Sequence, residues 1–228
     1  MDRNLKFTKH LDSSPNGGYI IDVGCFNVKY SSLMALHSIN NKKTFIGYCD
    51  INGVSSVNPM DRMPDRTMSI KPGYRKCDYG VLNSTLLRST KNHLTDAYIT
   101  PDKNIFFNKI KNLYNDISFV SIDLVSYIDC KDVISLLWNK MKYGGVIYFK
   151  NYTPLYSGAM KALDEFLQYH SENIITSRQM IVNGTKETEL FIKCFNPEFK
   201  PESTSPDRTE SVNVFCVLKT GGIYTSEY

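Results

Sequence analysis

The chain has 228 residues, a formal net charge of +4 and 42% hydrophobic residues, which suits one large α/β core and excludes a disordered or collagen-like chain. Lys and Arg occur only in loose groups, such as the one from Lys71 to Lys76, so a nucleic-acid partner is not expected. No apolar run is long enough to span a bilayer, and the N-terminus lacks the apolar core of a signal peptide. We therefore expect a cytoplasmic protein without a membrane span.

Short apolar runs alternate with amphipathic ones along the chain. The runs predict strands at 18–24, 43–50, near 97–99, at 117–124 and at 144–152, the last preceded by a Gly-Gly turn. Helices are predicted at 31–39, around 81–93, and at 103–115, 129–142 and 157–170, with a loop over 52–74. The segments 174–182 and 187–195 flank Asn183-Gly184, a strong hairpin signal. This order predicts an α/β fold with a mostly parallel central sheet, helices on both faces and an antiparallel C-terminal hairpin.

Chemically active residues stand where the predicted strands end. They are Asp22 and Gly24 after the first strand, Asp50 after the second, Asp123, and the pair Lys150-Asn151. Ligands of parallel sheets bind at the carboxyl ends of the strands, so these residues predict a single site. An acid at the end of a second strand commonly binds a ribose diol, which makes Asp50, together with Asp22, a candidate for a nucleoside-containing cofactor.

The loop after the first strand has only one of the glycines that a cofactor-binding turn usually carries. Gly24 supplies the tight turn, while Asn27, Val28 and Lys29 stand where further glycines would be. Asn tolerates unusual backbone angles, so we expect Asn27 to take the place of a glycine and Lys29 to point outward. The sequence thus predicts an atypical cofactor loop with Asp22, Gly24 and Asn27 as its binding residues.

Asp123 ends a very apolar strand, where an unpaired carboxylate would be costly. It is a candidate base, metal ligand or substrate-orienting group. Lys150 ends the neighbouring predicted strand, and each of the two would favour the charged form of the other. A purely structural ion pair remains an alternative.

Six cysteines lie far apart without a C-x-x-C pair. Several stand in apolar runs, which predicts buried reduced thiols rather than a disulfide framework or a zinc site. Residues 196–211 are rich in Pro, Ser and charge and are predicted to be a linker between residues 1–195 and a new strand in 212–228. An extra edge strand of the same domain is the alternative.

The segment 119–152, followed by 157–170, resembles the macrocin O-methyltransferase (TylF-like) family of class I S-adenosylmethionine-dependent methyltransferases. The family pattern has a strand ending in Ile-Asp, then a Tyr, a Lys-Asp pair, a Gly-Gly turn and a helix of the form Gly-x-x-Lys-Ala-x-Asp-Glu-Phe. The matching positions are Asp123, Tyr127, Lys131-Asp132, Gly144-Gly145, Tyr152 and Gly158 to Phe166. The resemblance implies a Rossmann-like class I methyltransferase fold and methylation of a sugar hydroxyl on a glycan or nucleotide-sugar.

By this resemblance, Gly24 and Asp50 hold S-adenosylmethionine, and Asp123 is a base or first metal ligand. Many members use magnesium, but Lys150-Asn151 stands where the family has an acidic pair. A Lys and an Asn do not form a hard-cation site, so the sequence favours catalysis by Asp123, Lys150 and Asn151 without a metal. The residues 212–228 resemble the start of a glycosyltransferase domain, which implies that the chain is part of a longer glycan-synthesising protein. A homo-oligomer is left open.

Two other functions fit the same residues. Lys6 or Lys9, Asp123, Lys150 and Glu189 can form the Lys-Asp-Lys-Glu tetrad of enzymes that methylate the ribose 2′-hydroxyl of RNA caps. Alternatively, the missing glycines and the lost acidic pair indicate a degenerate methyltransferase fold that acts as a non-catalytic binding or scaffold module.

Overall fold

The computed structural model describes residues 3–55, 57–61, 70–91, 98–114, 116–152, 156–170, 174–183, 185–194, 213–217 and 223–226, with side chains described from Phe7 to His170 except at positions 98 and 143. The helices are α1 (Arg3–Asp12), α2 (Val28–Asn40), the short 3-10 helix η1 (Pro59–Asp61), α3 (Tyr79–Ser89), α4 (Lys103–Lys111), α5 (Tyr127–Trp138) and α6 (Ser157–Tyr169). The strands are β1 (Tyr19–Val23), β2 (Thr44–Tyr48), β3 (Tyr98–Thr100), β4 (Ile117–Ile122), β5 (Met141–Phe149), β6 (Ile174–Asn183), β7 (Thr185–Cys194), β8 (Asn213–Val217) and β9 (Ile223–Ser226).

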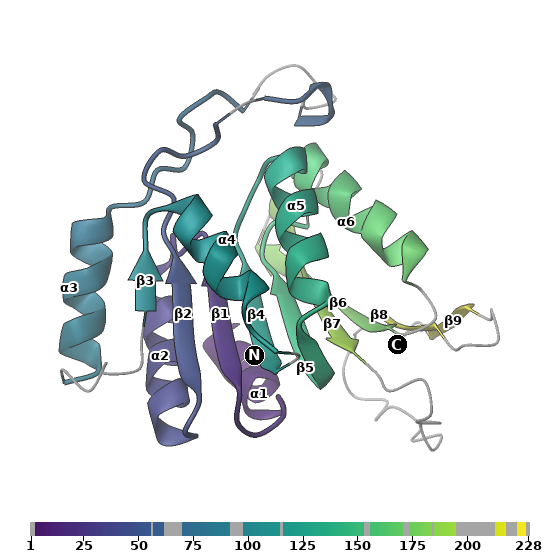
Figure 1. Ribbon diagram of the computed structural model, residues 1–228. Helices are drawn as coiled ribbons and strands as arrows, with labels where there is room; N and C mark the ends of the chain where they lie inside the picture. The colour runs from purple at the N-terminus through teal and green to yellow at the C-terminus, as the bar shows by residue number, and fades with distance from the viewer. Residues whose placement is uncertain are drawn as a thin grey trace.

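These strands form one sheet in the order β3-β2-β1-β4-β5-β7-β6-β8-β9 (Figure 1). The five strands from β3 to β5 are parallel, and β7 joins β5 in the antiparallel sense. The predicted hairpin is confirmed, since Asn183 at the end of β6 pairs with Thr185 at the start of β7. The predicted fold class, a mostly parallel Rossmann-like sheet with an antiparallel end, is therefore confirmed.

Two hydrophobic layers cover the sheet, and period-2 alternation along each strand supplies both. Ile20 in β1 and Phe119 in β4 face α1, α2 and α3, where they pack with Phe7 and Met34. The next residue along each strand faces the opposite layer, which α4, α5 and α6 cover. Strands buried on both faces explain why the sequence shows continuous apolar runs instead of alternation.

Polar side chains define where the helices begin. The N-cap residues Asn27, Asp78, Asp102 and Ser126 each accept a hydrogen bond from a backbone N–H of the first turn of their helix.

No helix was predicted before residue 18, yet α1 is present. Its buried apolar face consists of Phe7 and Leu11, one turn apart, which is too short a pattern to stand out in the sequence.

The Gly144-Gly145 pair lies within β5 instead of in a turn before it. Ile117 pairs with Met141 and Phe119 pairs with Val146, so the register shifts across the two glycines. Gly144 has φ +76, a backbone conformation that favours glycine. The predicted turn is thus a bulge, and β5 begins three residues earlier than expected.

At the C-terminal end of the chain, β8 pairs with β6 and β9 pairs with β8, both antiparallel. The sheet therefore continues through backbone segments on both sides of the predicted linker at 196–211, which lies outside the described residues. The proposed boundary at residue 212 stays a prediction. Within the described residues, no helix is long and apolar enough to cross a membrane.

Gly158 in α6 lies close to both η1 and the start of α5. A Cβ added there would clash with the carboxylate of Asp61 and lie 3.0 Å from the backbone nitrogen of Tyr127. We expect Gly158→Ala to lower the free energy of unfolding by about 1–3 kcal/mol because a well-packed contact must open. A urea titration measures this loss.

Gly80→Ala in α3 is the matched control, because the nearest atom to its added Cβ is 3.4 Å away. Ala in a helix should leave stability unchanged or raise it by about 0.5–1 kcal/mol. Equal stability of the two variants would contradict the close packing at Gly158.

Candidate functional site

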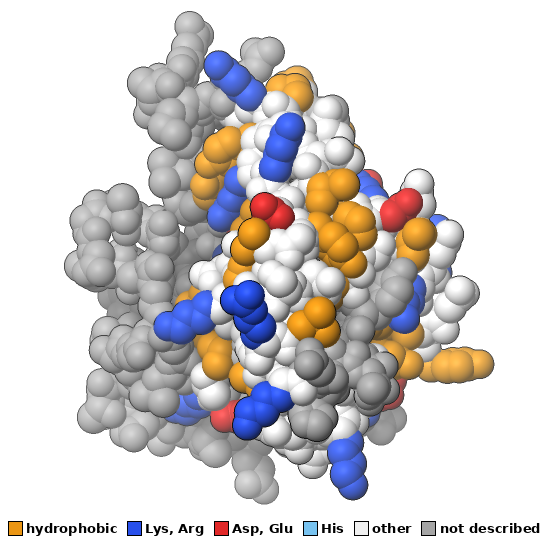
Figure 2. All heavy atoms as spheres, turned by 90° about the vertical axis from the view of Figure 1, so that its left-hand side faces the viewer, with side chains coloured by type: hydrophobic (Ala, Val, Ile, Leu, Met, Phe, Trp, Pro, Cys, Tyr) orange, Lys and Arg blue, Asp and Glu red, His pale blue; other side chains and the backbone are white. Residues whose placement is uncertain are grey.

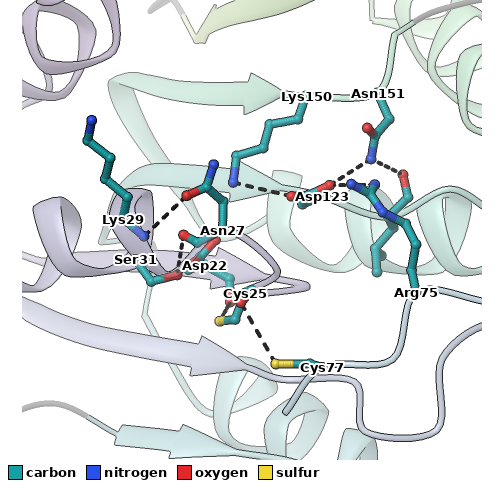
Figure 3. A network of polar contacts seen from close by, with 11 residues as sticks. Asp22, Cys25, Asn27, Lys29, Ser31, Arg75, Cys77, Asp123, Lys150 and Asn151 are labelled. Atoms are coloured by element: carbon teal, nitrogen blue, oxygen red, sulfur yellow. Dashed lines mark hydrogen bonds and ion pairs between the residues drawn. The ribbon is translucent and has the colours of Figure 1, made fainter. Parts of the chain in front are cut away.

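The carboxyl ends of β2, β1, β4 and β5 lie side by side because these strands are neighbours in the sheet. They bring Asp50, Gly24, Asp123 and Lys150 to the same edge, as the sequence predicted. Figure 3 shows the polar network that results, with Lys150, Asn151 and Arg75 all pointing toward Asp123. We take this edge as the candidate site.

Asp123 is the centre of the network. It is only 2% exposed, yet its Oδ1 accepts hydrogen bonds from Arg75 at 2.7 Å and from the Asn151 amide nitrogen at 2.8 Å. Its Oδ2 lies 3.4 Å from the Lys150 ammonium. Burial alone would raise the pKa of Asp123, but Lys150 and Arg75 outweigh burial and hold this pKa below its usual value. Asp123 is therefore an ionised carboxylate.

The Lys150 side chain, which is 9% exposed, interacts with two carboxylates and an aromatic ring. Burial would lower the pKa of Lys150, but Asp123 and Asp22 outweigh it and raise the pKa above the usual value. The ammonium also lies 4.9 Å from the centre of the Tyr30 ring, which favours a cation. Lys150 thus holds a fixed positive charge beside Asp123.

The turn after β1 depends on Gly24. This residue has φ +104, and a Cβ would lie 2.6 Å from the backbone oxygen of Asp123, so only glycine fits. The prediction that Asn27 takes a glycine-like conformation is wrong: its φ is −100, and it caps α2 by accepting a hydrogen bond from Lys29 N at 3.1 Å. Cys25, with φ +45, is the non-glycine residue in the left-handed region of this turn.

Asp22 lies beneath this turn and is fully buried. Its Oδ2 accepts a hydrogen bond from the Ser31 hydroxyl at 2.5 Å, while its Oδ1 is buried without a partner among the described residues. Burial raises the pKa of Asp22, although Lys150 and Ser31 act in the opposite direction. A buried acceptor without a donor is costly and is rarely left unexplained. Because Asp22 is fully buried, Oδ1 cannot contact a ligand above Gly24, and the charge that offsets its burial is that of Lys150.

Asp50 organises the loop that follows β2. Its Oδ1 accepts hydrogen bonds from the backbone nitrogens of Asn52 at 3.1 Å and Gly53 at 2.9 Å. Burial raises the pKa of Asp50, and these two N–H groups act against that rise. The Tyr48 hydroxyl also hydrogen-bonds to the Asp50 carboxylate, and burial together with this contact raises the pKa of Tyr48. Oδ2 accepts neither of the backbone bonds, so the Gly24 turn and Asp50 together fit a nucleoside cofactor such as S-adenosylmethionine.

The residues around Asp123 do not fit magnesium. Asn151 turns its amide nitrogen, not its oxygen, toward Asp123 and also donates to the Leu124 carbonyl at 3.0 Å. Both carboxylate oxygens of Asp123 already face cations or donors, and magnesium requires several oxygen ligands. In the part of the chain that the structure describes, no group of three His, Cys, Asp or Glu residues could hold a metal ion.

Arg75 is a site residue that sequence reasoning missed. It lies in the loop between β2 and α3, where no periodic pattern indicates which side chains turn inward. Its guanidinium lies near two aromatic rings, 5.0 Å from the centre of Phe26 and 5.6 Å from that of Tyr156. Its presence gives the buried Asp123 carboxylate a second positively charged neighbour.

A disulfide between Cys49 and Cys77 joins this loop to the end of β2. The prediction of reduced thiols is therefore wrong for this pair, because the loop folds back and brings together residues 28 positions apart. The prediction is confirmed for Cys25 and Cys130, which are buried and free. The side chains of the other two cysteines lie outside the described residues.

The residues that carry the family resemblance mostly join α5 to α6. Tyr127 donates to Glu165 at 2.7 Å, and Lys131 contacts both the Tyr127 hydroxyl at 2.9 Å and the Glu165 carboxylate at 3.2 Å. Tyr152 donates to Asp164 at 2.6 Å. Only Asp123 of the matched positions lies in the polar network of the candidate site, so most of the pattern reflects helix packing.

Of the Lys-Asp-Lys-Glu residues, the structure brings Asp123 and Lys150 together. Lys9 is exposed on α1, and the side chains of Lys6 and Glu189 lie outside the described residues.

No protein-family model matches the sequence, and no curated protein sequence is significantly similar to it. The resemblance to the macrocin O-methyltransferase family therefore stays a prediction. Solved structures do match the fold, and several of them are methyltransferases of low sequence identity.

The calicheamicin methyltransferase CalS11, also described as a TDP-rhamnose 3′-O-methyltransferase, matches with a TM-score of 0.58 at 16% identity over 82% of this chain and 76% of its own. The O-methyltransferase NovP matches with a TM-score of 0.58 at 14% identity, over 85% and 80% of the two chains. TomG from Streptomyces achromogenes, solved with S-adenosylmethionine, has a TM-score of 0.55 at 12% identity over 86% and 82%. The chain therefore has the fold of class I methyltransferases.

The disulfide should stabilise the folded chain by restricting the unfolded one. A closed loop of this length predicts a loss of about 3–4 kcal/mol in the free energy of unfolding when Cys77 is replaced by Ser or the disulfide is reduced. Urea titrations with and without dithiothreitol measure the loss. The reductant should not affect the Cys77→Ser variant, and peptide mapping that finds two free thiols in the native protein would contradict the assignment.

The Asp123–Lys150 pair predicts a pH-dependent effect of Lys150→Met. In the native protein, the lowered pKa of Asp123 contributes stability above the usual carboxylate pKa, which is lost as the pH falls through the lowered value. Without Lys150, the pKa values of Asp22 and Asp123 in the folded state rise. Ionising these two buried carboxyl groups is then unfavourable, so the variant loses stability as the pH rises through the raised pKa values. We expect a loss of about 3 kcal/mol near about pH 8. That loss should shrink by at least about 1 kcal/mol near about pH 5.

Urea titrations at both pH values measure this difference. Lys161→Met, which removes an exposed lysine that lies 3.7 Å from Glu165, is the control and should have little effect at either pH. A loss for Lys150→Met that does not change with pH would contradict the charge coupling.

Proposed function

We propose that the protein is an S-adenosylmethionine-dependent O-methyltransferase that acts on a sugar hydroxyl of a glycan or nucleotide-sugar. The observation that carries the proposal is the ionised Asp123 paired with the Lys150 ammonium at the strand ends, next to the Gly24 turn. The shared fold supports it, because CalS11, which modifies a sugar nucleotide by its description, matches the chain over most of its length.

The cofactor would lie over the Gly24 turn. Asp50 is placed for the ribose hydroxyls, and the Gly24 turn lets the backbone come close to the ligand. When bound, S-adenosylmethionine supplies a methyl group on a positively charged sulfur. The chain mainly has to hold the acceptor oxygen in line with that methyl group and manage one proton.

Asp123 would accept a hydrogen bond from the acceptor hydroxyl. Because its pKa is lowered, it is a weak base that orients the hydroxyl in the ground state. The hydroxyl proton becomes acidic as the oxygen bonds to the methyl carbon, and a weak base is then sufficient to receive it. Lys150 stays protonated and keeps the Asp123 carboxylate ionised until it receives the proton. Asn151 holds the Asp123 carboxylate in place through its 2.8 Å hydrogen bond.

A ribose 2′-O-methyltransferase acting on RNA caps is the second candidate. The Asp123–Lys150 pair favours it, since both residues belong to the tetrad of such enzymes. Glu189 also precedes Leu190, the β7 partner of Phe149, so its backbone lies at the register position next to Lys150. The steep salt dependence of RNA binding distinguishes this function from methylation of a small sugar acceptor.

Calorimetric titration with S-adenosylhomocysteine tests the cofactor site, and methyl transfer to sugar acceptors tests the activity. We expect Asp123→Asn to lower the rate constant of methyl transfer by about 100-fold or more, because the acceptor hydroxyl loses its anionic partner. Asp132→Asn, at an exposed position on α5, should retain full activity. If S-adenosylhomocysteine does not bind at millimolar concentration, the result would contradict the proposal and favour the non-catalytic scaffold.

A further inference from the structure

The backbone of Arg75 adopts an unusual conformation. Its φ is +57, in the left-handed region that non-glycine residues rarely occupy and that costs about 1–2 kcal/mol. The loop is fixed on both sides of it: the backbone nitrogen of Val54 donates to the Tyr74 carbonyl at 3.0 Å, and that of Cys77 donates to the Asp50 carbonyl at 2.8 Å. The disulfide to Cys49 adds a covalent link two residues further on. Strain held by so many contacts is typical of a functional position.

The guanidinium of Arg75 contacts Asp123 and lies near two aromatic rings. Its NH1 donates to Asp123 Oδ1, and its central carbon lies over the rings of Phe26 and Tyr156. The Tyr156 hydroxyl lies 3.3 Å from that of Tyr74, which helps to fix its ring. The Arg75 side chain is nevertheless 25% exposed. A guanidinium has five donors, so a held but partly exposed Arg can still bind a second anion.

The surroundings of Arg75 favour an anion. Lys71 and Lys76 are exposed on the same loop, and Lys29 is exposed beyond the Gly24 turn. The acid in contact with Arg75 is Asp123, whose charge is shared with Lys150, and Asp78 on the same loop caps α3 by accepting from Val81 N at 3.0 Å. Figure 2 shows Lys and Arg side chains spread over the side of the molecule that carries α3, with few acidic ones between them.

We propose that Arg75 is a specificity-determining residue that binds a phosphate group carried by the acceptor sugar. The acceptor is then a small phosphorylated sugar, such as a nucleoside diphosphate sugar, and not a neutral glycan. Its phosphate binds the exposed edge of the Arg75 guanidinium while its hydroxyl lies against Asp123. Arg is suited to this role because its planar donors match phosphate oxygens better than the single ammonium of Lys does. The position of the acceptor hydroxyl against Asp123 rests on the proposed function. The binding of phosphate to Arg75 does not depend on that function.

Binding of inorganic pyrophosphate tests the proposal without any methyl transfer. Calorimetric titration at constant sodium chloride should give a dissociation constant that is about 10-fold or more weaker for Arg75→Gln than for the native protein. Arg75→Lys should lie between the two, because it keeps the charge and loses the planar donors. Arg88→Gln, which removes an exposed Arg from α3, is the matched control and should bind like the native protein.

Glucose 1-phosphate and methyl glucoside separate the phosphate from the sugar. We expect glucose 1-phosphate to compete with pyrophosphate and the neutral glycoside not to compete. No binding of pyrophosphate to the native protein would overturn the proposal. An equal loss of pyrophosphate affinity in Arg75→Gln and Arg88→Gln would also overturn the proposal, because it would indicate unspecific attraction to a basic surface.

S-adenosylhomocysteine binding separates this proposal from the proposed function. We expect Arg75→Gln to keep its affinity for this cofactor product, since Arg75 contacts none of the residues assigned to the cofactor. Arg75-dependent pyrophosphate binding without any cofactor binding would support the phosphate site and contradict the methyltransferase. Methyl transfer to a neutral glycan that is unaffected by Arg75→Gln would support the methyltransferase and overturn the phosphate site.

Discussion

The burial of the Asp123 carboxylate is the constraint on which the site depends. A charge in this position is stable only if cations and hydrogen-bond donors surround it. They come from two other parts of the chain: Lys150 and Asn151 at the end of β5, and Arg75 in the loop after β2. Gly24, at the end of β1, packs against the backbone of Asp123. One carboxylate therefore fixes the relative positions of three strand ends and a long loop.

The same arrangement determines which chemistry is available. In a metal site, carboxylates hold a divalent cation that attracts the acceptor oxygen. Here the positive charge is built into the chain as Lys150 and Arg75, and Asn151 presents a donor where a metal would need an oxygen. The pKa of Asp123 is lowered and that of Lys150 is raised, so both remain charged across the neutral range. The proposed function relies on this pair of fixed charges to orient an acceptor hydroxyl group.

The sequence was sufficient for features that follow from regular structure. Apolar runs gave the parallel strands, and the ends of parallel strands must meet at one edge, so the proximity of Asp123 and Lys150 was predictable. Arg75, the Cys49–Cys77 disulfide and the left-handed Cys25 were not, because each depends on how an irregular loop folds back in space. The 52–74 loop was recognised as a loop, but no periodicity shows which side chains of a loop turn inward. The family-like pattern around Tyr127 and Glu165 was informative about the fold, since it joins α5 to α6.

A crystal structure with S-adenosylhomocysteine tests the central claim most directly. We expect the ribose hydroxyls to contact Asp50, the amino-acid part of the ligand to lie over Gly24, and its sulfur to face Asp123. The phosphate-binding edge of Arg75 should remain accessible in that complex. A ligand bound elsewhere, or no ligand density above Gly24 at saturating concentration, would contradict the account.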